Sequence, residues 1–434
     1  MTARRGSART SRRSDPQGAA SSPTRRRTAV SPTRTSQRTA TETSTSGIDL
    51  ANDALVSSPD GGATWPTGTA QCREGDRPWL AGGPGHTVFL ANDPEEGPWQ
   101  VVRSSDAGAS CSTTYLDRQP GNATGYGKIV YDETTDTLWD AAITGTTVGA
   151  ISYAGANAAF DRAASSSPST PTSIGTFSYH QITPPGQTTS FNTFWKAQIA
   201  ESNDAPPAQR TLYVVWSTAE TPTNHVYLAS STDNGASWVT TTVASPTGTA
   251  YSPWVTAGTD GRVAVAWEEY ANSVSSPSSA PADDKMYVKL AMISGGNTDH
   301  PSVDQVIEPM GAHGPVHTGP ICTSGTTCVA SPTGDRRLGE FFTMNPDQYG
   351  CVMLAVGDTM MKDPVTGGEL PTARGLYTVQ DSGSSLTGDN CAVAHPDLQA
   401  NLPELADPAL AAVAGLLIAG TVVVRRRRVT ARNT

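Results

Sequence analysis

The stretch Ser231-Thr232-Asp233-Asn234-Gly235-Ala236-Ser237-Trp238 decides the fold, because the chain repeats its pattern. The pattern Ser/Thr-x-Asp-x-Gly-x-Ser/Thr-Trp returns as Ser58-Pro59-Asp60-Gly61-Gly62-Ala63-Thr64-Trp65. A weaker copy runs from Ser104 through Asp106 and Gly108, with Cys111 where the others have Trp. In such a segment Asp and Ser accept hydrogen bonds from turn N–H groups, and Gly takes the positive-φ position. Trp packs under the turn as the next strand begins, so the repeat predicts β-hairpins.

Short alternating or apolar runs, separated by turn residues, fill the chain between these copies. Long helical periodicity is absent before residue 408, and 41 Gly and 32 Pro among 434 residues fit a chain rich in turns. The first two copies begin at residues 58 and 104, about one propeller blade apart. We therefore predict an all-β domain over residues 47–392, and the family resemblance described below implies that it is a six-bladed β-propeller. The first expected blade ends near residue 70. The other five span residues 76–117, 120–165, 190–246, 250–310 and 337–390. The first is expected to be incomplete.

The repeat is the Asp-box, or bacterial neuraminidase repeat, and residues 47–390 resemble the sialidase-like β-propellers that carry it. Four further stretches resemble actinobacterial secreted members: residues 76–81, 252–257, 261–267 and 337–342. In that family the boxes are structural and lie at the blade rim, between the third and fourth strands. The resemblance therefore implies structural roles for Ser58, Asp60, Gly62, Trp65, Asp106, Gly108, Ser231, Asp233, Gly235 and Trp238.

Sialidase chemistry would need three arginines for the substrate carboxylate, a Tyr–Glu nucleophile pair and an Asp acid/base. The family's Phe/Tyr-Arg-Ile/Leu-Pro motif is absent. The candidates are Arg77 with Asp76, Arg337, Glu269 beside Tyr270, and Tyr377. Arg77 and Arg337 each precede an expected innermost strand. Adjacent residues on a strand point to opposite faces, so Glu269 and Tyr270 are poorly placed as a pair.

Charge divides the chain into three parts. Ten Arg and two acids give residues 1–46 a charge of +8, and five Arg give residues 425–434 a charge of +5. The total is -10, so residues 47–424 carry -23. Such an acidic surface repels nucleic acid, so a glycan or cell-surface partner is expected for a monomeric propeller.

The two ends predict a surface protein. Residues 1–46 lack large apolar side chains and are expected to be disordered. They also lack the apolar stretch of an export signal. We therefore expect that the natural protein starts at a position other than Met1 of this sequence. After a linker at 393–407, residues 408–424 are expected to span a membrane, because sixteen uncharged residues from Ala409 precede four Arg. The positive-inside rule puts the basic tail, 425–434, in the cytoplasm and the propeller outside.

Wall anchoring is the alternative to a membrane span. The segment Leu402-Pro403-Glu404 matches the start of a gram-positive sorting signal of the form Leu-Pro-x-Thr-Gly. Leu405 and Ala406 replace the Thr-Gly pair at which such signals are cut. This departure favours plain membrane anchoring.

Six cysteines fit export and predict three disulfides, with fifteen possible pairings. They are Cys72, Cys111, Cys322, Cys328, Cys351 and Cys391. The pair Cys322–Cys328 is the easiest to close. No CxxC spacing, P-loop, dinucleotide fingerprint or twelve-residue calcium loop occurs, so no metal or cofactor is expected.

Two functions remain open. The first is a membrane-anchored exo-glycosidase of the exo-alpha-sialidase type. The second is a non-catalytic propeller that binds a glycan or a protein partner.

Overall fold

The computed structural model describes much of residues 52–395 and a short earlier strand. The described residues are 30–33, 52–60, 63–65, 70–94, 97–125, 127–164, 170–183, 197–202, 204, 209–218, 224–311, 313–322, 335, 338, 342–363, 365–368, 370 and 373–395. No helix in these ranges is long and apolar enough to cross a membrane. The span expected at 408–424 and the basic tail lie outside them.

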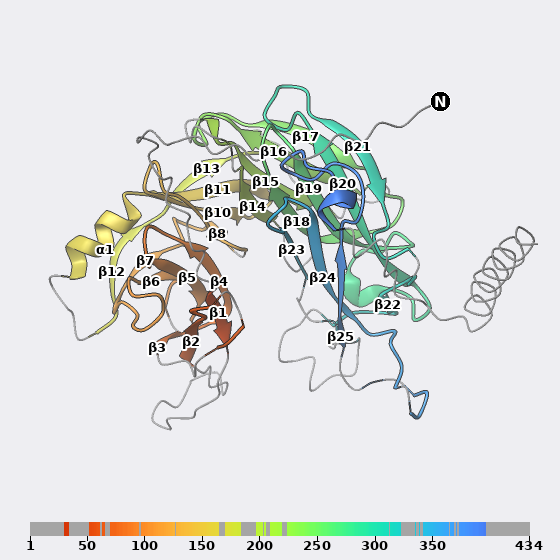
Figure 1. The fold of residues 1–434 in the computed structure, drawn as a ribbon, viewed down its shortest axis with the longest axis horizontal. Helices are drawn as coiled ribbons and strands as arrows, with labels where there is room; N and C mark the ends of the chain where they lie inside the picture. Colours follow the sequence, from red (N-terminus) through yellow and green to blue (C-terminus); the bar gives the residue numbers. More distant parts are fainter. Residues whose placement is uncertain are drawn as a thin grey trace, which may run out of the picture.

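Within the described ranges the strands form six sheets, which follow one another around an arc (Figure 1). The first holds β1 (Val30–Thr33), β2 (Asn52–Ser57) and β3 (Ala70–Glu74). The second holds β4 (Asp76–Gly82), β5 (Val88–Asp93), β6 (Gln100–Ser104) and β7 (Thr114–Asp117), with β12 (Thr172–Thr176) beside β7. The third holds β8 (Thr124–Gly125), β9 (Val130–Asp132), β10 (Thr137–Thr144), β11 (Thr147–Ala154) and β13 (Ser178–Gln181).

The remaining sheets continue the same antiparallel meander. The fourth holds β14 (Ala197–Glu201), β15 (Leu212–Ser217), β16 (Val226–Ser231) and β17 (Val239–Ala244). The fifth holds β18 (Ala250–Ala257), β19 (Val263–Tyr270), β20 (Lys285–Ser294), β21 (Ser302–Ile307) and β22 (His317–Thr318). The sixth holds β23 (Phe342–Pro346), β24 (Val352–Asp358) and β25 (Arg374–Val379). Short helical turns are η2 (Pro277–Ser279) and α3 (Cys391–Ala394).

The all-β propeller class is confirmed, with the five sheets from β4 to β25 as successive blades. The three-stranded β1–β3 sheet stands where the incomplete first blade was expected. The prediction of disorder throughout residues 1–46 does not hold for Val30–Thr33, which pairs antiparallel with Ala54–Ser57. Backbone hydrogen bonding needs no large apolar side chain, which is why composition did not indicate this strand.

The propeller has two distinct ends. The strands β4, β9, β14, β18 and β23 lie innermost, and neighbouring blades meet where β14 contacts β18 and β18 contacts β23. We call the end at which these strands begin the inner-strand face. In an antiparallel meander the first and third strands run the same way. Turns that follow third strands, including those of the second and third Asp-boxes, therefore lie at the opposite end.

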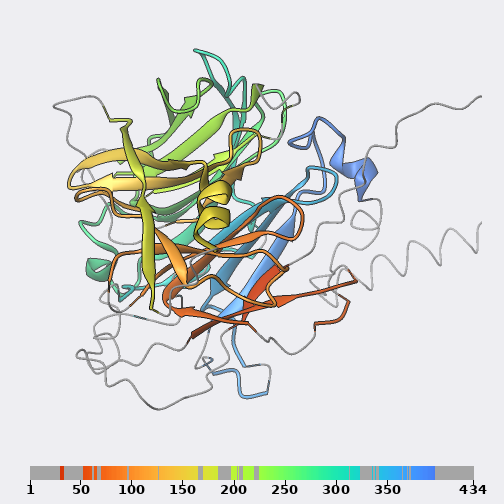
Figure 2. The same ribbon diagram turned by 90° about the vertical axis from the view of Figure 1, so that its left-hand side faces the viewer.

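One blade departs from the simple meander. Where the third sheet would turn after β11, the chain forms α1 (Ala156–Ala164) and then β12, which pairs parallel with β7 of the neighbouring sheet. The Asp136 carboxylate accepts hydrogen bonds from the N–H groups of Asn157 and Ala158 and so caps the start of α1. Figure 2 shows α1 and β12 together on one side of the molecule.

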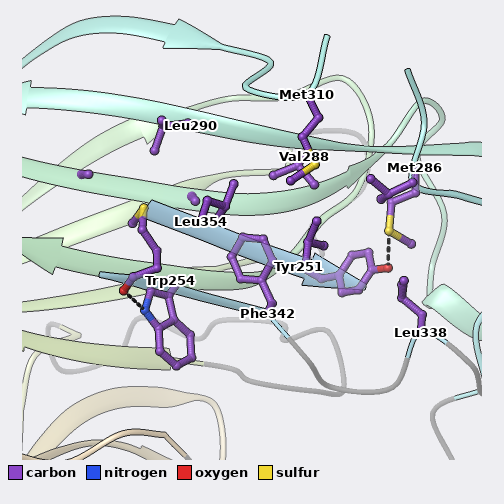
Figure 3. Packing of buried hydrophobic residues seen from close by; sticks show 14 of the residues in the cluster. Tyr251, Trp254, Met286, Val288, Leu290, Met310, Leu338, Phe342 and Leu354 are labelled. Atoms are coloured by element: carbon purple, nitrogen blue, oxygen red, sulfur yellow. Dashed lines mark hydrogen bonds between the residues drawn. The ribbon is translucent and has the colours of Figure 1, made fainter. Parts of the chain in front are cut away.

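The core lies between blades, and Figure 3 shows the part between the fifth and sixth sheets. Tyr251, Met286, Phe342 and Leu354 are all buried there. The Tyr251 hydroxyl donates to Met286 Sδ at 2.9 Å. Full burial of each such side chain stabilises the fold by about 1.5–3 kcal/mol, so these contacts hold successive sheets together.

Disulfides reinforce the first and last sheets. Cys72 on β3 pairs with Cys111, and Cys351 pairs with Cys391. Cys322 is also disulfide-bonded, whereas Cys328, its expected partner, lies outside the described residues. The presence of disulfides agrees with the predicted export.

Candidate functional site

The second and third Asp-boxes lie on turns that join a third strand to a fourth, and the first lies between β2 and β3 of the three-stranded sheet. The second box joins β6 to β7, and the third joins β16 to β17. In the third box Ser231 Oγ donates to Asp233 Oδ1 at 2.8 Å, and the same oxygen accepts from Ser237 N–H at 2.9 Å. Gly235 adopts a φ of +78° and donates its N–H to Ser231 Oγ. These contacts keep the Asp233 side chain within its own turn.

The first two boxes use the same bonding. Asp60 Oδ1 accepts from Thr64 N–H at 2.8 Å, and Asp106 Oδ1 accepts from Ser110 N–H at 2.8 Å. The hydrogen bonds from Thr64 lower the pKa of Asp60 to about 2. The Gly62 position of the first box lies outside the described residues. The second and third boxes sit at the end opposite the inner-strand face.

A second repeated segment lies at the inner-strand face. Its two copies were noted in the sequence as separate stretches, 76–81 and 252–257, and not as a repeat. The sequences Arg77-Pro78-Trp79 on β4 and Ser252-Pro253-Trp254 on β18 occupy matching places in their blades. Arg77 and Ser252 both have a φ of +50°, an uncommon value for a side-chain-bearing residue. The strand register shifts at both places, as in a β-bulge, before pairing resumes at the Trp.

The two bulges bring their tryptophans together. The rings of Trp79 and Trp254 have centroids 5.1 Å apart at an angle of 48°. Lys128 Nζ lies 5.4 Å from the Trp254 ring centroid and donates to the backbone oxygen of Val255 at 2.9 Å. Burial lowers the pKa of Lys128 to about 8. The inner strands of two blades therefore meet around an aromatic pair and one half-buried cation.

Each bulge also faces an acid on the second strand of its blade. Asp93 lies opposite Asp76, and Glu268 lies opposite Tyr251. Burial raises the pKa of Asp93 to about 6, although Arg77 lowers it from 2.6 Å away. Burial likewise raises the pKa of Glu268 to about 8. Both carboxyls hold a proton far more readily than an exposed acid does.

A buried ion pair between the second and third sheets lies next to Asp93. Arg118 Nη1 lies 2.9 Å from Asp140 Oδ2, and both side chains are almost completely buried. Burial raises the pKa of Asp140 to about 7, with Arg118 opposing the shift. Asp93 also interacts electrostatically with Arg118. The charges alternate from Arg77 through Asp93 and Arg118 to Asp140.

Several arginines are committed to contacts inside the protein. Hydrogen bonds or ion pairs hold Arg73 to Gln100, Arg77 to Asp93, Arg103 to Asp161, Arg118 to Asp140, Arg210 to Glu201 and Arg262 to Asp260. Each of these six guanidinium groups therefore has an acceptor within the protein.

Two of the other predicted candidates, Glu269 and Tyr377, lie within the described residues. Glu269 accepts from Trp267 Nε1 at 2.8 Å, while the Tyr270 hydroxyl donates to the Gly319 carbonyl oxygen, so these neighbours are not paired. Glu268, and not Glu269, interacts electrostatically with Tyr270. Tyr377 is 64% exposed on the outermost strand β25. Arg337 lies outside the described residues.

Sequence reasoning missed Asp93, Lys128, Asp140 and the role of Glu268. The available signal was the repeated Pro-Trp pair at 78–79 and 253–254, because aligning the two strands places Asp93 and Glu268 in matching positions. The contacts of Lys128 and Asp140 depend on how blades pack, which no local pattern records.

One side-chain group has the composition of a metal site. Ligand atoms of Asp347, Cys351 and His395 lie within 4.8 Å of one another. Cys351 is bonded to Cys391, so its sulfur is not a thiolate. His395 Nε2 also contacts the Asp347 carboxylate directly. This group is accounted for by a disulfide and a hydrogen bond.

Comparison with known proteins shows distant similarity to propeller enzymes. No protein-family model matches the chain, and no curated protein matches it. An endo-arabinase from Bacteroides thetaiotaomicron is 13% identical, with 70% of this chain and 92% of that one covered and a TM-score of 0.35. An alpha-L-arabinofuranosidase from Lactobacillus brevis is 13% identical, with 70% and 89% covered and a TM-score of 0.36. The intramolecular trans-sialidase from Ruminococcus gnavus is 12% identical, with 75% and 87% covered and a TM-score of 0.37.

Proposed function

We propose that the protein binds glycans through the inner-strand face at the start of β4. The observation that carries this proposal is the group formed by Asp76, Arg77 and Trp79. The side chains of Arg77 and Asp76 are 24% and 45% exposed, and Trp79 is partly buried beside them. An aromatic ring flanked by charged hydrogen-bonding groups is suited to a sugar, which has apolar C–H faces and polar hydroxyls.

The backbone supports this assignment because it holds the group in one geometry. Arg77 keeps a φ of +50° directly before Pro78, a combination that unstrained chains avoid. Its guanidinium is fixed by Asp93 at 2.6 Å, and the Trp79 ring is fixed by Trp254. A ligand meeting these side chains would have little ordering entropy to overcome.

Glycoside hydrolysis is the second candidate function, favoured by one observation. A carboxyl with a pKa of about 6, as at Asp93, can act as a general acid near neutral pH. Glu268 is the second buried acid in the matching position. The exo-alpha-sialidase type is the less favoured reaction, because acids already balance the positive charges of Arg77 and Arg118 that a substrate carboxylate would need.

The proposed setting is the outer surface of a cell. In this proposal the β1–β3 sheet is the first of six blades, residues 408–424 anchor the chain in a membrane, and the propeller acts outside as a monomer. The support is the uncharged run from Ala409, the four Arg after it, and the disulfides Cys72–Cys111 and Cys351–Cys391. Wall anchoring through 402–404 remains the alternative.

Binding and turnover measured on the same full-length protein test both functions. Glycan-array binding is compared for the parent, Arg77→Gln and Asp76→Asn, with Arg262→Gln as a matched control. Arg262 also pairs with an acid, Asp260, but precedes β19 at the opposite end. We expect the first two variants to lose binding and the control to keep it. Equal binding by all four proteins contradicts the proposal.

Turnover is measured with fluorogenic aryl glycosides of sialic acid, arabinofuranose and galactose. Cleavage that is lost in Asp93→Asn establishes hydrolysis. If the protein binds glycans but cleaves none of these aryl glycosides, the result supports a non-catalytic glycan-binding propeller.

A further inference from the structure

A cavity lies at the blade rim, away from the inner-strand face. Its volume is about 370 Å³, and its walls come from the second Asp-box, the residues before β7, and α1. Box turns lie at the end opposite the starts of β4 and β18, so this cavity is separate from the Arg77 group. Its size falls in the range of small-molecule sites.

The sequence makes room for the cavity by departing from the Asp-box pattern. In the third box Trp238 packs against the core and donates its Nε1 to the Gly235 oxygen at 3.2 Å. In the second box Cys111 stands at that place and is bonded to Cys72, so no indole fills the space under the turn. The opposite wall is α1, which presents the small side chain of Ala163 beside Phe160.

The charged group of the cavity is Arg103, the residue just before the box. It is 7% exposed, and its guanidinium lies 5.3 Å from the Phe160 ring centroid. Its Nη1 donates to Asp161 and to Asn157 Oδ1, both at 2.6 Å. Its buried Nε donates to no residue in the described part of the chain. The contacts with Asn157 and Asp161 of α1 therefore hold the Arg103 side chain in place at the wall of the cavity.

Charge decides which ligand fits. Asp161 already balances Arg103, and the other described residues that line the cavity are uncharged, so an added anion would meet no net positive charge there. The remaining lining is rich in hydroxyl groups, including Ser110 and Thr113. Hydroxyls, one neutralised arginine and an aromatic wall match a neutral polyhydroxylated molecule better than a phosphate or a carboxylate.

We propose that this rim cavity is a second carbohydrate site, which holds one neutral sugar residue. Arg103 and the box hydroxyls hydrogen-bond to its hydroxyl groups, and Phe160 and Ala163 contact its apolar face. The site works without the Arg77 group. It would hold a glycan at the rim while the inner-strand face engages another part of it.

The test uses ligand-observed NMR on the full-length protein with three neutral probes: the methyl glycosides of galactose, arabinose and N-acetylglucosamine. Methyl glucuronide is the anionic comparison. Thr113→Trp places an indole at the exposed mouth of the cavity, and Thr240→Trp is its control at the equivalent, also exposed position of the third box. Arg103→Lys keeps the charge for Asp161 and removes the planar fork.

We expect at least one neutral glycoside to bind, with binding weakened at least about tenfold in Thr113→Trp and Arg103→Lys and unchanged in Thr240→Trp. Every protein in this test also carries Arg77→Gln, which removes binding at the inner-strand face, so the outcome is separate from that of the proposed function. The inference is overturned if no neutral glycoside binds, if only the glucuronide binds, or if Thr113→Trp binds as the parent does. Thermal unfolding of each variant checks that the fold is retained.

Discussion

Trp79 and Trp254 lie against each other with ring centroids 5.1 Å apart, although 175 positions separate them in the chain. Each follows a proline and a positive-φ residue on the innermost strand of its blade. Trp254 is 2% exposed and donates its Nε1 to the Met344 oxygen at 2.8 Å, on the innermost strand of the last sheet. This one side chain therefore connects β4, β18 and β23.

We expect Trp254→Ala to be severely destabilising. The variant loses a buried aromatic side chain and its hydrogen bond, and loss of such a side chain costs about 3–5 kcal/mol. Trp254→Phe should cost less, because it retains the ring contact with Trp79. Urea denaturation followed by circular dichroism measures both. Trp65→Ala is the control, since Trp65 is 45% exposed, and its cost should be well below that of Trp254→Ala. Equal losses in the two alanine variants would refute the connecting role of Trp254.

The propeller class was predictable from sequence because its signals are local. The box at Ser231–Trp238 sets its own hydrogen bonds, and the same pattern at Ser58 marks another turn of the same kind. Strand β1 was not predictable, because Val30–Thr33 is stabilised by pairing with residues more than twenty positions away.

The site was predictable only in part. Arg77 and Asp76 were found because they precede an expected innermost strand. Asp93 and Glu268 were not chosen, because their raised pKa values come from burial between blades, which appears only after the sheets assemble. Glu269 looked equally suitable in the sequence, yet the strand alternation turns it toward Trp267.

The Asp-box carboxylates should be stabilising and catalytically silent. Asp233→Ala removes acceptors used by Ser231 and Ser237 and should lower the free energy of unfolding by on the order of 1–2 kcal/mol. Asp304→Ala is the control, because that exposed residue accepts a surface hydrogen bond from Ser294 and should change stability by less than about 0.5 kcal/mol. Chemical denaturation provides the measurement. An Asp233→Ala protein as stable as the parent would be inconsistent with this role.

The pKa of Asp93 should move in opposite directions in two neighbouring variants. Arg77 lowers this pKa and Asp76 raises it. Arg77→Gln should therefore raise the Asp93 pKa above about 6, and Asp76→Asn should lower it. Carbon-detected NMR titration of the Asp93 carboxyl gives each value. Shifts of the same sign in both variants, or no shift in either, would show that these charges do not act on Asp93.

Glu268 should make the fold less stable as the solution becomes alkaline. Its folded-state pKa is about 8 against an ordinary value of 4.5. Its contribution is thus fully present below pH 4.5 and is lost as pH rises through 8. Glu268→Gln keeps the side chain uncharged, so it should melt several degrees above the parent at pH 9 and much closer to it at pH 4. Glu308→Gln, a change at an exposed acid paired with Lys289, controls for loss of one negative charge. Thermal unfolding measures the melting temperatures of all three proteins at both pH values. If the difference in melting temperature between Glu268→Gln and the parent does not grow with pH, Glu268 is not a buried, protonated acid.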